Sequence, residues 1–268
     1  MSGLGAALVA EYRKVLSTRL WWLLAIVMFG YVAFLAGVIA LSLTVDPPGP
    51  DPVALRGEAA AVSAYSVVNG GGYVFPLVIG SLAMTTEFRH KTITQSLLVQ
   101  PSRTVFLAAK LLAAVPIGLL YGVVGTLGAV AAAAPVLTVQ GDGAFLTAGD
   151  VVTGLLAGVL VTVLWTAVGV AFGSLVTNQV AAVVVILAFT QFVEPVARSV
   201  GGAIDAVAPI AQYLPGAAAD AVIGGSFFAG FGGEVDLLPR WAGFVVLVAY
   251  AVVLAVLGRL TTLRRDLA

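Results

Sequence analysis

Long uncharged apolar runs constrain this chain more than any other feature of its sequence. The segment from Trp21 to Val45 carries no charged residue, and as a helix it would reach roughly 37 Å, enough to cross a bilayer with tilt. Of the 268 residues 60% are hydrophobic and only 10% are charged, whereas a soluble domain carries about 25% charged residues. The sequence therefore predicts an all-α polytopic membrane protein.

The apolar runs divide the chain into the segments of one transmembrane domain, residues 1–268. We expect an N-terminal interfacial helix over 2–19, where apolar residues such as Leu4 and Leu8 recur on one helix face. We expect six transmembrane helices over 21–45, 65–86, 105–137, 150–176, 180–196 and 241–260. Between them we expect a cytoplasmic coupling loop over 87–103 and an outer re-entrant region over 197–240.

Prolines mark the two outer interruptions of the apolar pattern. The stretch from Asp46 to Pro52 ends the first span, because proline cannot continue the helical hydrogen-bond ladder, and residues 46–64 are predicted to form a polar loop. The fifth apolar segment, Val180 to Val193, has only 14 residues before Glu194 and Pro195, whereas a full crossing needs about 20. Further prolines interrupt residues 194–240, which favours re-entrant or interfacial pieces there.

The distribution of charge predicts the orientation of the six spans. The N-terminal segment, the 87–110 segment and the C-terminal end hold ten of the thirteen basic residues, and ten of the thirteen acidic residues fall on the other side. The positive-inside rule makes the basic side cytoplasmic. We therefore expect a multi-pass protein of the cell membrane with both termini in the cytoplasm, and a basic rim that favours anionic lipid.

Several function classes are excluded or disfavoured by what the sequence lacks. It has no cysteine and one histidine, so thiolate and histidine-rich metal sites are not available. The zero net charge argues against nucleic-acid binding. Gly70 to Gly72 lack the lysine and Ser/Thr spacing of a phosphate-binding loop and are interpreted as packing or hinge residues. Pairs such as Gly169 and Gly173 are expected by chance among 31 glycines.

A polar, basic island from Thr85 to Lys110 separates the second and third spans. We expect a helix from Glu87 to about Val99 that stops before Pro101, with Glu87 at the positive helix end. One interpretation is an ordinary positive-inside loop. The other is a docking surface for a partner protein.

The island resembles the first cytoplasmic loop of ABC-2 type transporter permeases. The resemblance is carried by Glu87-Phe88-Arg89, Thr92-Ile93, Pro101-Ser102-Arg103 and Lys110, and by the overall layout of spans. Small actinobacterial members are the most similar, also through Tyr213-Leu214-Pro215-Gly216-Ala217-Ala218.

The resemblance implies a membrane subunit whose coupling helix docks on a separate ATPase subunit, with two permease subunits and two ATPases in one transporter. The implied coupling residues are Glu87, Phe88, Arg89, His90, Lys91, Thr92, Ile93 and Arg103. This chain has no Walker A motif, so ATP hydrolysis is expected in the partner, and neither a catalytic residue nor a cofactor is predicted here.

The predicted substrate path is sparsely polar. Candidates are Asn69, Thr126, Thr162, Thr166, Thr190 and Gln191. Because no charged residue is placed clearly mid-membrane, an apolar or amphipathic substrate such as a drug or lipid-like molecule is expected, and a proton relay is not. Glu194 and Asp205 could gate the outer mouth, although solvated loop charges are the favoured interpretation.

Three other functions compete with an ATP-driven exporter. A channel or secondary transporter would require intramembrane charges or inverted repeats, and neither is recognised in the sequence. An intramembrane enzyme would place His90 at its centre, but no carboxylate or metal-ligand set is evident around it. A non-transporting sensor or immunity subunit would use the same fold.

Overall fold

The structure, a computed structural model, describes residues 4–44, 55–141, 143–204, 208–228 and 237–264. Within these ranges it is built from helices and has no strand. Six helical segments are long and apolar enough to cross a membrane, which confirms the predicted class of all-α membrane protein. The predicted loop residues Asp46 to Pro52, Asp142 and Asp205 lie outside the described ranges.

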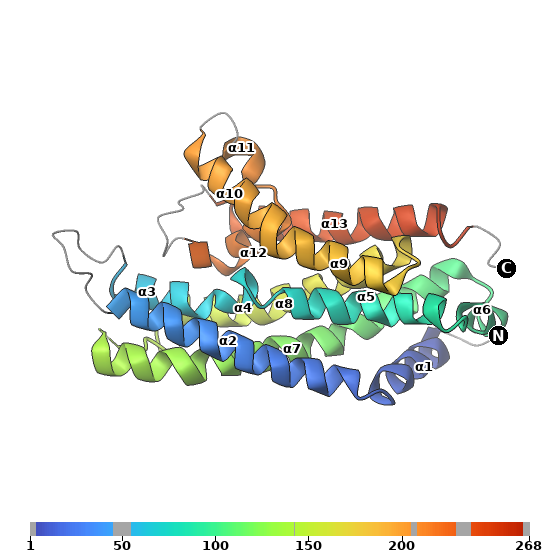
Figure 1. The fold of residues 1–268 in the computed structure, drawn as a ribbon, viewed down its shortest axis with the longest axis horizontal. Coiled ribbons are helices and arrows are strands. Elements are labelled where there is room, and N and C mark those ends of the chain that lie inside the picture. The colour runs from blue at the N-terminus through green and yellow to red at the C-terminus, as the bar shows by residue number, and fades with distance from the viewer. Residues whose placement is uncertain (1–3, 45–54, 142, 205–207, 229–236, 265–268) are drawn as a thin grey trace.

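Four of the six segments are uninterrupted helices that run along the long axis of the molecule (Figure 1). They are α2 (Leu20–Thr44), α7 (Arg103–Gln140), α8 (Gly149–Leu175) and α13 (Arg240–Leu260). Their bounds lie within three residues of the spans expected over 21–45, 105–137, 150–176 and 241–260. In the bundle α7 packs against α2 and α8, and α8 packs in turn against α5 (Val74–Arg89) and α13.

The parts of the chain that were predicted to be cytoplasmic gather at one end of the bundle. Helix α1 (Leu4–Leu16), the short α6 (Ile93–Val99) and the C-terminal end of α13 lie together there, whereas α3 (Gly57–Tyr65) lies at the opposite end (Figure 1). The bundle therefore brings together the basic segments that are far apart in the sequence.

The second span begins earlier than expected and is broken. Residues 57–64 were predicted to be loop, but they form most of α3, because their alanine-rich sequence favours helix and buries Ala60, Ala61 and Ala64. A short α4 (Val67–Gly70) follows, and α5 begins after a turn at residues 71–73. At Gly72 a Cβ atom would lie 2.6 Å from the Val68 carbonyl oxygen, so this turn requires a glycine.

The fifth span is longer than expected, because Pro195 does not end it. Helix α9 (Gln179–Ala188) continues through a π-helical turn, η1 (Phe189–Val193), into α10 (Glu194–Ala203). The wider π turn accommodates the proline, which has no N–H to donate. The carboxylate of Glu194 is buried and accepts hydrogen bonds from the Tyr73 hydroxyl and the Gly216 N–H. The charge and the proline that suggested a helix end are thus compatible with one continuous span.

The region expected to be re-entrant contains short helices rather than a further span. The chain forms α11 (Ala208–Ala211) and α12 (Pro215–Ile223). All nine residues of α12 are buried, and this helix packs mainly against α13 and α8. Its amino-terminal proline and the left-handed Gly224 that follows it are typical signals of a helix start and a helix stop.

The predicted helix from Glu87 to Val99 is in fact two helices joined by a sharp turn. Helix α5 extends through Arg89, and the N–H groups of Lys91 and Thr92 bond back to the carbonyls of Phe88 and Glu87 at 3.2 and 3.0 Å. This is a Schellman motif, with Lys91 in the left-handed conformation (φ 55°) that glycine usually adopts. The turn redirects the chain into α6.

Glycines allow α5 and α8 to approach closely. A Cβ atom on Gly169 would lie 2.3 Å from the Leu77 carbonyl oxygen, and one on Gly173 would lie 2.6 Å from that of Ser81. Gly80 faces α8 in the same way, at 2.2 Å from the Thr166 carbonyl oxygen. The pair Gly169 and Gly173 is therefore a packing surface rather than the chance pattern that the sequence suggested.

Replacing Gly169 with alanine is expected to destabilise the protein by about 1–3 kcal/mol, because the added methyl group forces α5 and α8 apart. The matched control is Gly30→Ala in α2, where a Cβ atom would meet nothing within 4 Å. That substitution should be neutral or slightly stabilising through helix propensity. Unfolding free energies in detergent measure both effects, and equal values for the two variants would contradict the close packing.

Candidate functional site

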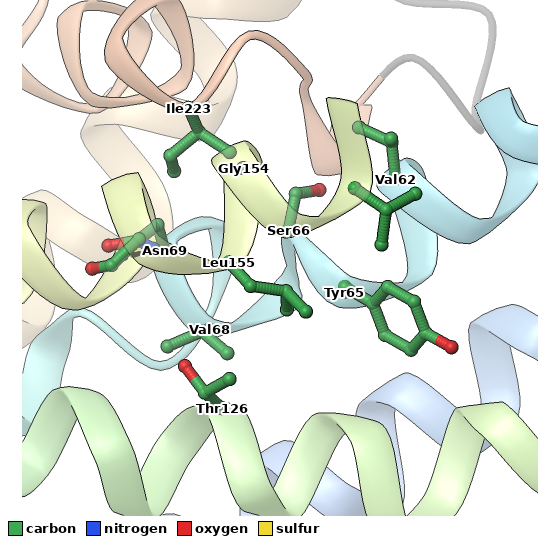
Figure 2. A pocket seen from close by; sticks show the side chains of 11 residues that line it. Val62, Tyr65, Ser66, Val68, Asn69, Thr126, Gly154, Leu155 and Ile223 are labelled. Atoms are coloured by element: carbon green, nitrogen blue, oxygen red, sulfur yellow. Dashed lines mark hydrogen bonds between the residues drawn. The ribbon is translucent and has the colours of Figure 1, made fainter. Parts of the chain in front are cut away.

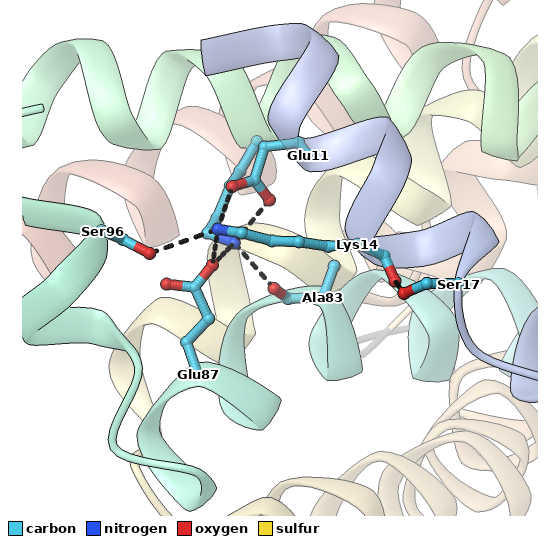
Figure 3. A network of polar contacts seen from close by, with 7 residues as sticks. Glu11, Lys14, Ser17, Ala83, Glu87 and Ser96 are labelled. Carbon is cyan, nitrogen blue, oxygen red and sulfur yellow. Dashed lines mark hydrogen bonds and ion pairs between the residues drawn. The ribbon is translucent and has the colours of Figure 1, made fainter. Parts of the chain in front are cut away.

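Two lysines and two glutamates form a partly buried network beside the α5–α6 turn, in which only Lys14 is exposed (Figure 3). Glu87 Oε1 accepts hydrogen bonds from Lys14 Nζ at 2.7 Å and Lys110 Nζ at 2.6 Å. Glu11 accepts from the same two lysines at 2.8 and 2.7 Å. Lys110 also donates to the Ala83 carbonyl oxygen at 2.9 Å. The network ties α1, α5 and α7 together at the end of the bundle where α6 lies.

The four charges of this network balance, which explains how three of them can be buried while Lys14 reaches the surface. Glu11, Glu87 and Lys110 expose 6%, 4% and 2% of their surface, and buried charges are tolerated when they are paired and hydrogen-bonded. Burial lowers the pKa of Lys14, but its hydrogen bonds and charge interactions with Glu11 and Glu87 outweigh this and raise its pKa above the ordinary value. Lys14 therefore remains protonated at neutral pH.

This arrangement divides the predicted coupling residues between the interior and the surface. Glu87 and Ile93 are buried, while Phe88, Thr92 and Arg103 are half-buried. The exposed members are Arg89, His90 and Lys91 at the turn, and Arg89 donates to Gln179 Oε1 at 3.3 Å. Glu87 consequently supports the turn from the interior and is too buried to contact a partner protein.

The sequence did not single out the most exposed apolar side chains of this end. Leu98 and Val99, in the last turn of α6, expose 77% and 71% of their surface. Together with Arg89, His90 and Lys91 they form the surface that we call the α6 rim. The sequence does show two aliphatic residues directly before Gln100 and Pro101. Because a single helix from Glu87 to Val99 was predicted, the exposure of these two side chains could not be inferred.

Of the six candidate substrate-path residues, Asn69, Thr162 and Thr166 lie close together in the bundle interior, and Thr190 is buried elsewhere, on η1. Asn69 Nδ2 donates to the Gly158 carbonyl oxygen at 3.5 Å, and Thr162 Oγ1 donates to the same oxygen at 2.8 Å. Thr166 donates to the Thr162 carbonyl oxygen at 2.9 Å. Gln191 is exposed on η1 and does not join them.

Asn69 lines a small enclosed cavity between α3, α4, α7 and α8 (Figure 2). Its volume is about 20 Å³, which is enough for one water molecule and too little for an organic substrate. Thr126 from α7 lines the same cavity, and Thr162 and Thr166 do not. The space beside Asn69 is therefore a small notch with mostly apolar walls.

A second buried charge cluster, between α10 and α12, was missed by sequence reasoning. Arg198 forms an ion pair with Asp220. Both side chains are also hydrogen-bonded to Ser226, whose hydroxyl accepts from Arg198 and donates to Asp220 at 2.6 Å. Glu194 accepts from the Tyr73 hydroxyl at 2.7 Å and from the Gly216 N–H. The expectation that Glu194 is a solvated loop charge is wrong, because the residue exposes only 1% of its surface.

The expectation that no charged residue is placed clearly mid-membrane stays a prediction, but two charges lie on the fifth span. Glu194 and Arg198 belong to a helical segment, Gln179–Gly201, that is long and apolar enough to span. Glu194 lies fifteen residues after Gln179, roughly 22 Å along the helix axis. The expected span, 180–196, contained Glu194 but ended before Arg198.

In the described part of the chain no group of three or more His, Cys, Asp or Glu side chains is placed to hold a metal ion. His90 stands exposed at the turn after α5. Comparison with known proteins finds no family model and no curated protein that matches the chain.

Proposed function

We propose that this chain is the membrane subunit of an ATP-driven transporter of the ABC-2 type, and that a separate ATPase subunit docks on the α6 rim. The observation that carries the proposal is the placement of the rim. It is an exposed surface with both basic and apolar side chains, held on a buried ion network at the end of the bundle that carries most of the basic residues.

The ion network gives the rim a physical route into the membrane. Glu87 is the last buried residue of α5 before the turn, and Lys110 lies on α7, which contacts both α2 and α8. A push on α6 would reach α5 through a short turn, and the four paired charges would transfer it to α1 and α7. Movement of such packed helices is one way to alternate access across a membrane.

Other parts of the proposal follow from the resemblance and the charge pattern. The rim faces the cytoplasm of the cell membrane, α1 lies at the membrane surface, and the α11–α12 region re-enters from the outer side. A second permease subunit completes the transporter, and the substrate is apolar or amphipathic. Because the notch beside Asn69 holds about one water, we place the substrate path between the two subunits.

Leu98→Glu is expected to abolish binding of the ATPase, because a carboxylate would replace an exposed apolar side chain of the rim. The matched control is Val139→Glu in the last turn of α7, which is 81% exposed at the opposite end of the bundle. Tagged full-length protein is purified in mild detergent, and co-purifying ATPases are identified by mass spectrometry and assayed. Absence of any ATPase from the wild-type preparation would refute the proposal, as would equal recovery with both variants.

A secondary transporter is the second candidate, and the buried Glu194, Arg198 and Asp220 favour it. Ionisable groups inside a membrane frequently mark ion pathways, and the π-helical turn next to Glu194 is a feature often found at functional sites. Transport by reconstituted protein separates the two candidates. Dependence on an ion gradient without any ATPase supports the second candidate, and dependence on ATP and the partner supports the first.

A further inference from the structure

A groove opens beside the ion network, between α1, α5 and the α5–α6 turn. Its volume is about 420 Å³, within the range of sites that hold small organic ligands. One part of its lining is apolar and comes from the starts or interiors of spans: Leu20, Ile79, Leu82 and Ala83. The other part is polar and comes from the cytoplasmic end: Lys14, Ser17, Thr18, Thr86, His90 and Thr92.

One carboxylate oxygen in the wall of this groove has no hydrogen-bond partner. Glu87 Oε1 accepts from both lysines, but Oε2 accepts from no group among the described residues. Glu87 is 4% exposed and lines the groove. In Figure 3 the Glu87 oxygen that carries no dashed line lies on the side of Ser96, which is another residue of the groove lining. A buried acceptor without a donor costs free energy, so the groove calls for a ligand that donates a hydrogen bond.

The charges around the groove indicate what kind of donor fits. The two lysines and two glutamates cancel, so the carboxylate is already neutralised and a third ammonium group would gain little from it. Beyond the network, Arg19, Arg89 and Lys91 are exposed at the same end of the bundle, which makes the surroundings positive. A ligand with a neutral hydroxyl donor and a negative charge close by satisfies both conditions.

We propose that this groove binds a phospholipid with a hydroxylated, anionic head group, of the phosphatidylglycerol type. The head-group hydroxyl donates to Glu87 Oε2, the phosphate lies toward the basic turn, and an acyl chain lies along Leu20, Ile79 and Leu82. The lining supports this orientation, because its apolar part belongs to the spans and its polar part belongs to the end outside them. Basic pockets at the cytoplasmic ends of spans are known sites for anionic lipid.

Native mass spectrometry of the full-length protein tests this inference. The protein is incubated with equal amounts of phosphatidylglycerol, phosphatidylmethanol and phosphatidylethanolamine that carry the same acyl chains. Phosphatidylmethanol has the same phosphate diester charge without any hydroxyl donor, and phosphatidylethanolamine offers an ammonium donor. Phosphatidylglycerol should bind about tenfold more tightly than either, as expected for one hydrogen bond to a charged group. Preference for one of the other lipids, or no preference, would overturn the proposal.

A pair of variants locates the bound lipid. Ala83→Phe fills the groove and should weaken phosphatidylglycerol binding by about tenfold. Ala7→Phe adds the same ring to the neighbouring cavity on the other side of Lys14 and should leave binding unchanged. If Ala83→Phe does not fold, Thr92→Trp at the turn replaces it. Equal binding by the groove variant and the control would exclude this site. The inference is independent of ATPase docking, since lipid binding is measured on this subunit alone.

Discussion

Lys110→Met is expected to destabilise the protein by about 3–5 kcal/mol, because it leaves two buried carboxylates with one shared ammonium group. Lys110 has no exposed side-chain surface and joins Glu11 on α1 to Glu87 on α5. Methionine preserves the apolar stem of the lysine, so the loss reports the charge rather than a cavity. Titration with a denaturing detergent, followed by tryptophan fluorescence, measures the free energy of unfolding.

Two further variants make this result specific to the ion network. Lys91→Met removes an exposed lysine from the turn after α5 and should change stability by less than about 0.5 kcal/mol. Adding Glu87→Gln to Lys110→Met restores the charge balance between Glu11 and Lys14 and should recover part of the lost stability. A similar small effect for Lys110→Met and Lys91→Met would show that the network contributes nothing to folding.

The spans that were predicted well are those whose ends coincide with a change from apolar to polar residues. Helix α2 begins at Leu20 directly after Arg19, and α13 begins at Arg240 directly after Pro239. Local hydrophobicity determines such ends, since a lipid-exposed helix must be apolar over its whole length. The sequence therefore predicts these helices without knowledge of their neighbours.

The spans that were predicted poorly depend on contacts between segments distant in sequence. The helix containing Glu194 continues because Tyr73 and Gly216, far away in the chain, donate hydrogen bonds to that carboxylate. Helix α3 begins within a stretch that seemed polar because its alanines find a buried face against α2 and α7. Neither partner can be inferred from the local pattern of a single sequence.

The candidate coupling site shows the same division between local and distant information. The basic, polar character of residues 87–103 was visible in the sequence, and so was a helix end before Pro101. The burial of Glu87 was not, because it depends on Lys14 arriving from α1, 73 positions earlier in the chain. Leu98, which the sequence left unremarked, lies on the exposed surface once the Schellman turn separates α6 from α5.

Arg198→Met is the second substitution for which a large loss is expected, about 3–5 kcal/mol. Asp220 has no exposed surface. In the described part of the chain Arg198 is the cation that balances its charge, and the Ser226 hydroxyl donates a hydrogen bond to its carboxylate. Removing the guanidinium also removes its contact with the Phe228 ring, whose centroid lies 4.3 Å away. Thermal unfolding and detergent titration of the purified protein give the size of the effect.

Combining Arg198→Met with Asp220→Asn distinguishes a structural pair from a functional one. The double variant no longer buries an uncompensated charge and should regain most of the stability that Arg198→Met loses. Arg240→Met, at an exposed arginine of α13, is the matched control and should be nearly neutral. If the double variant folds well but transports nothing, the pair serves the transport cycle as the secondary-transporter candidate requires. If it folds and transports like the wild type, the pair only fastens α12 to α10.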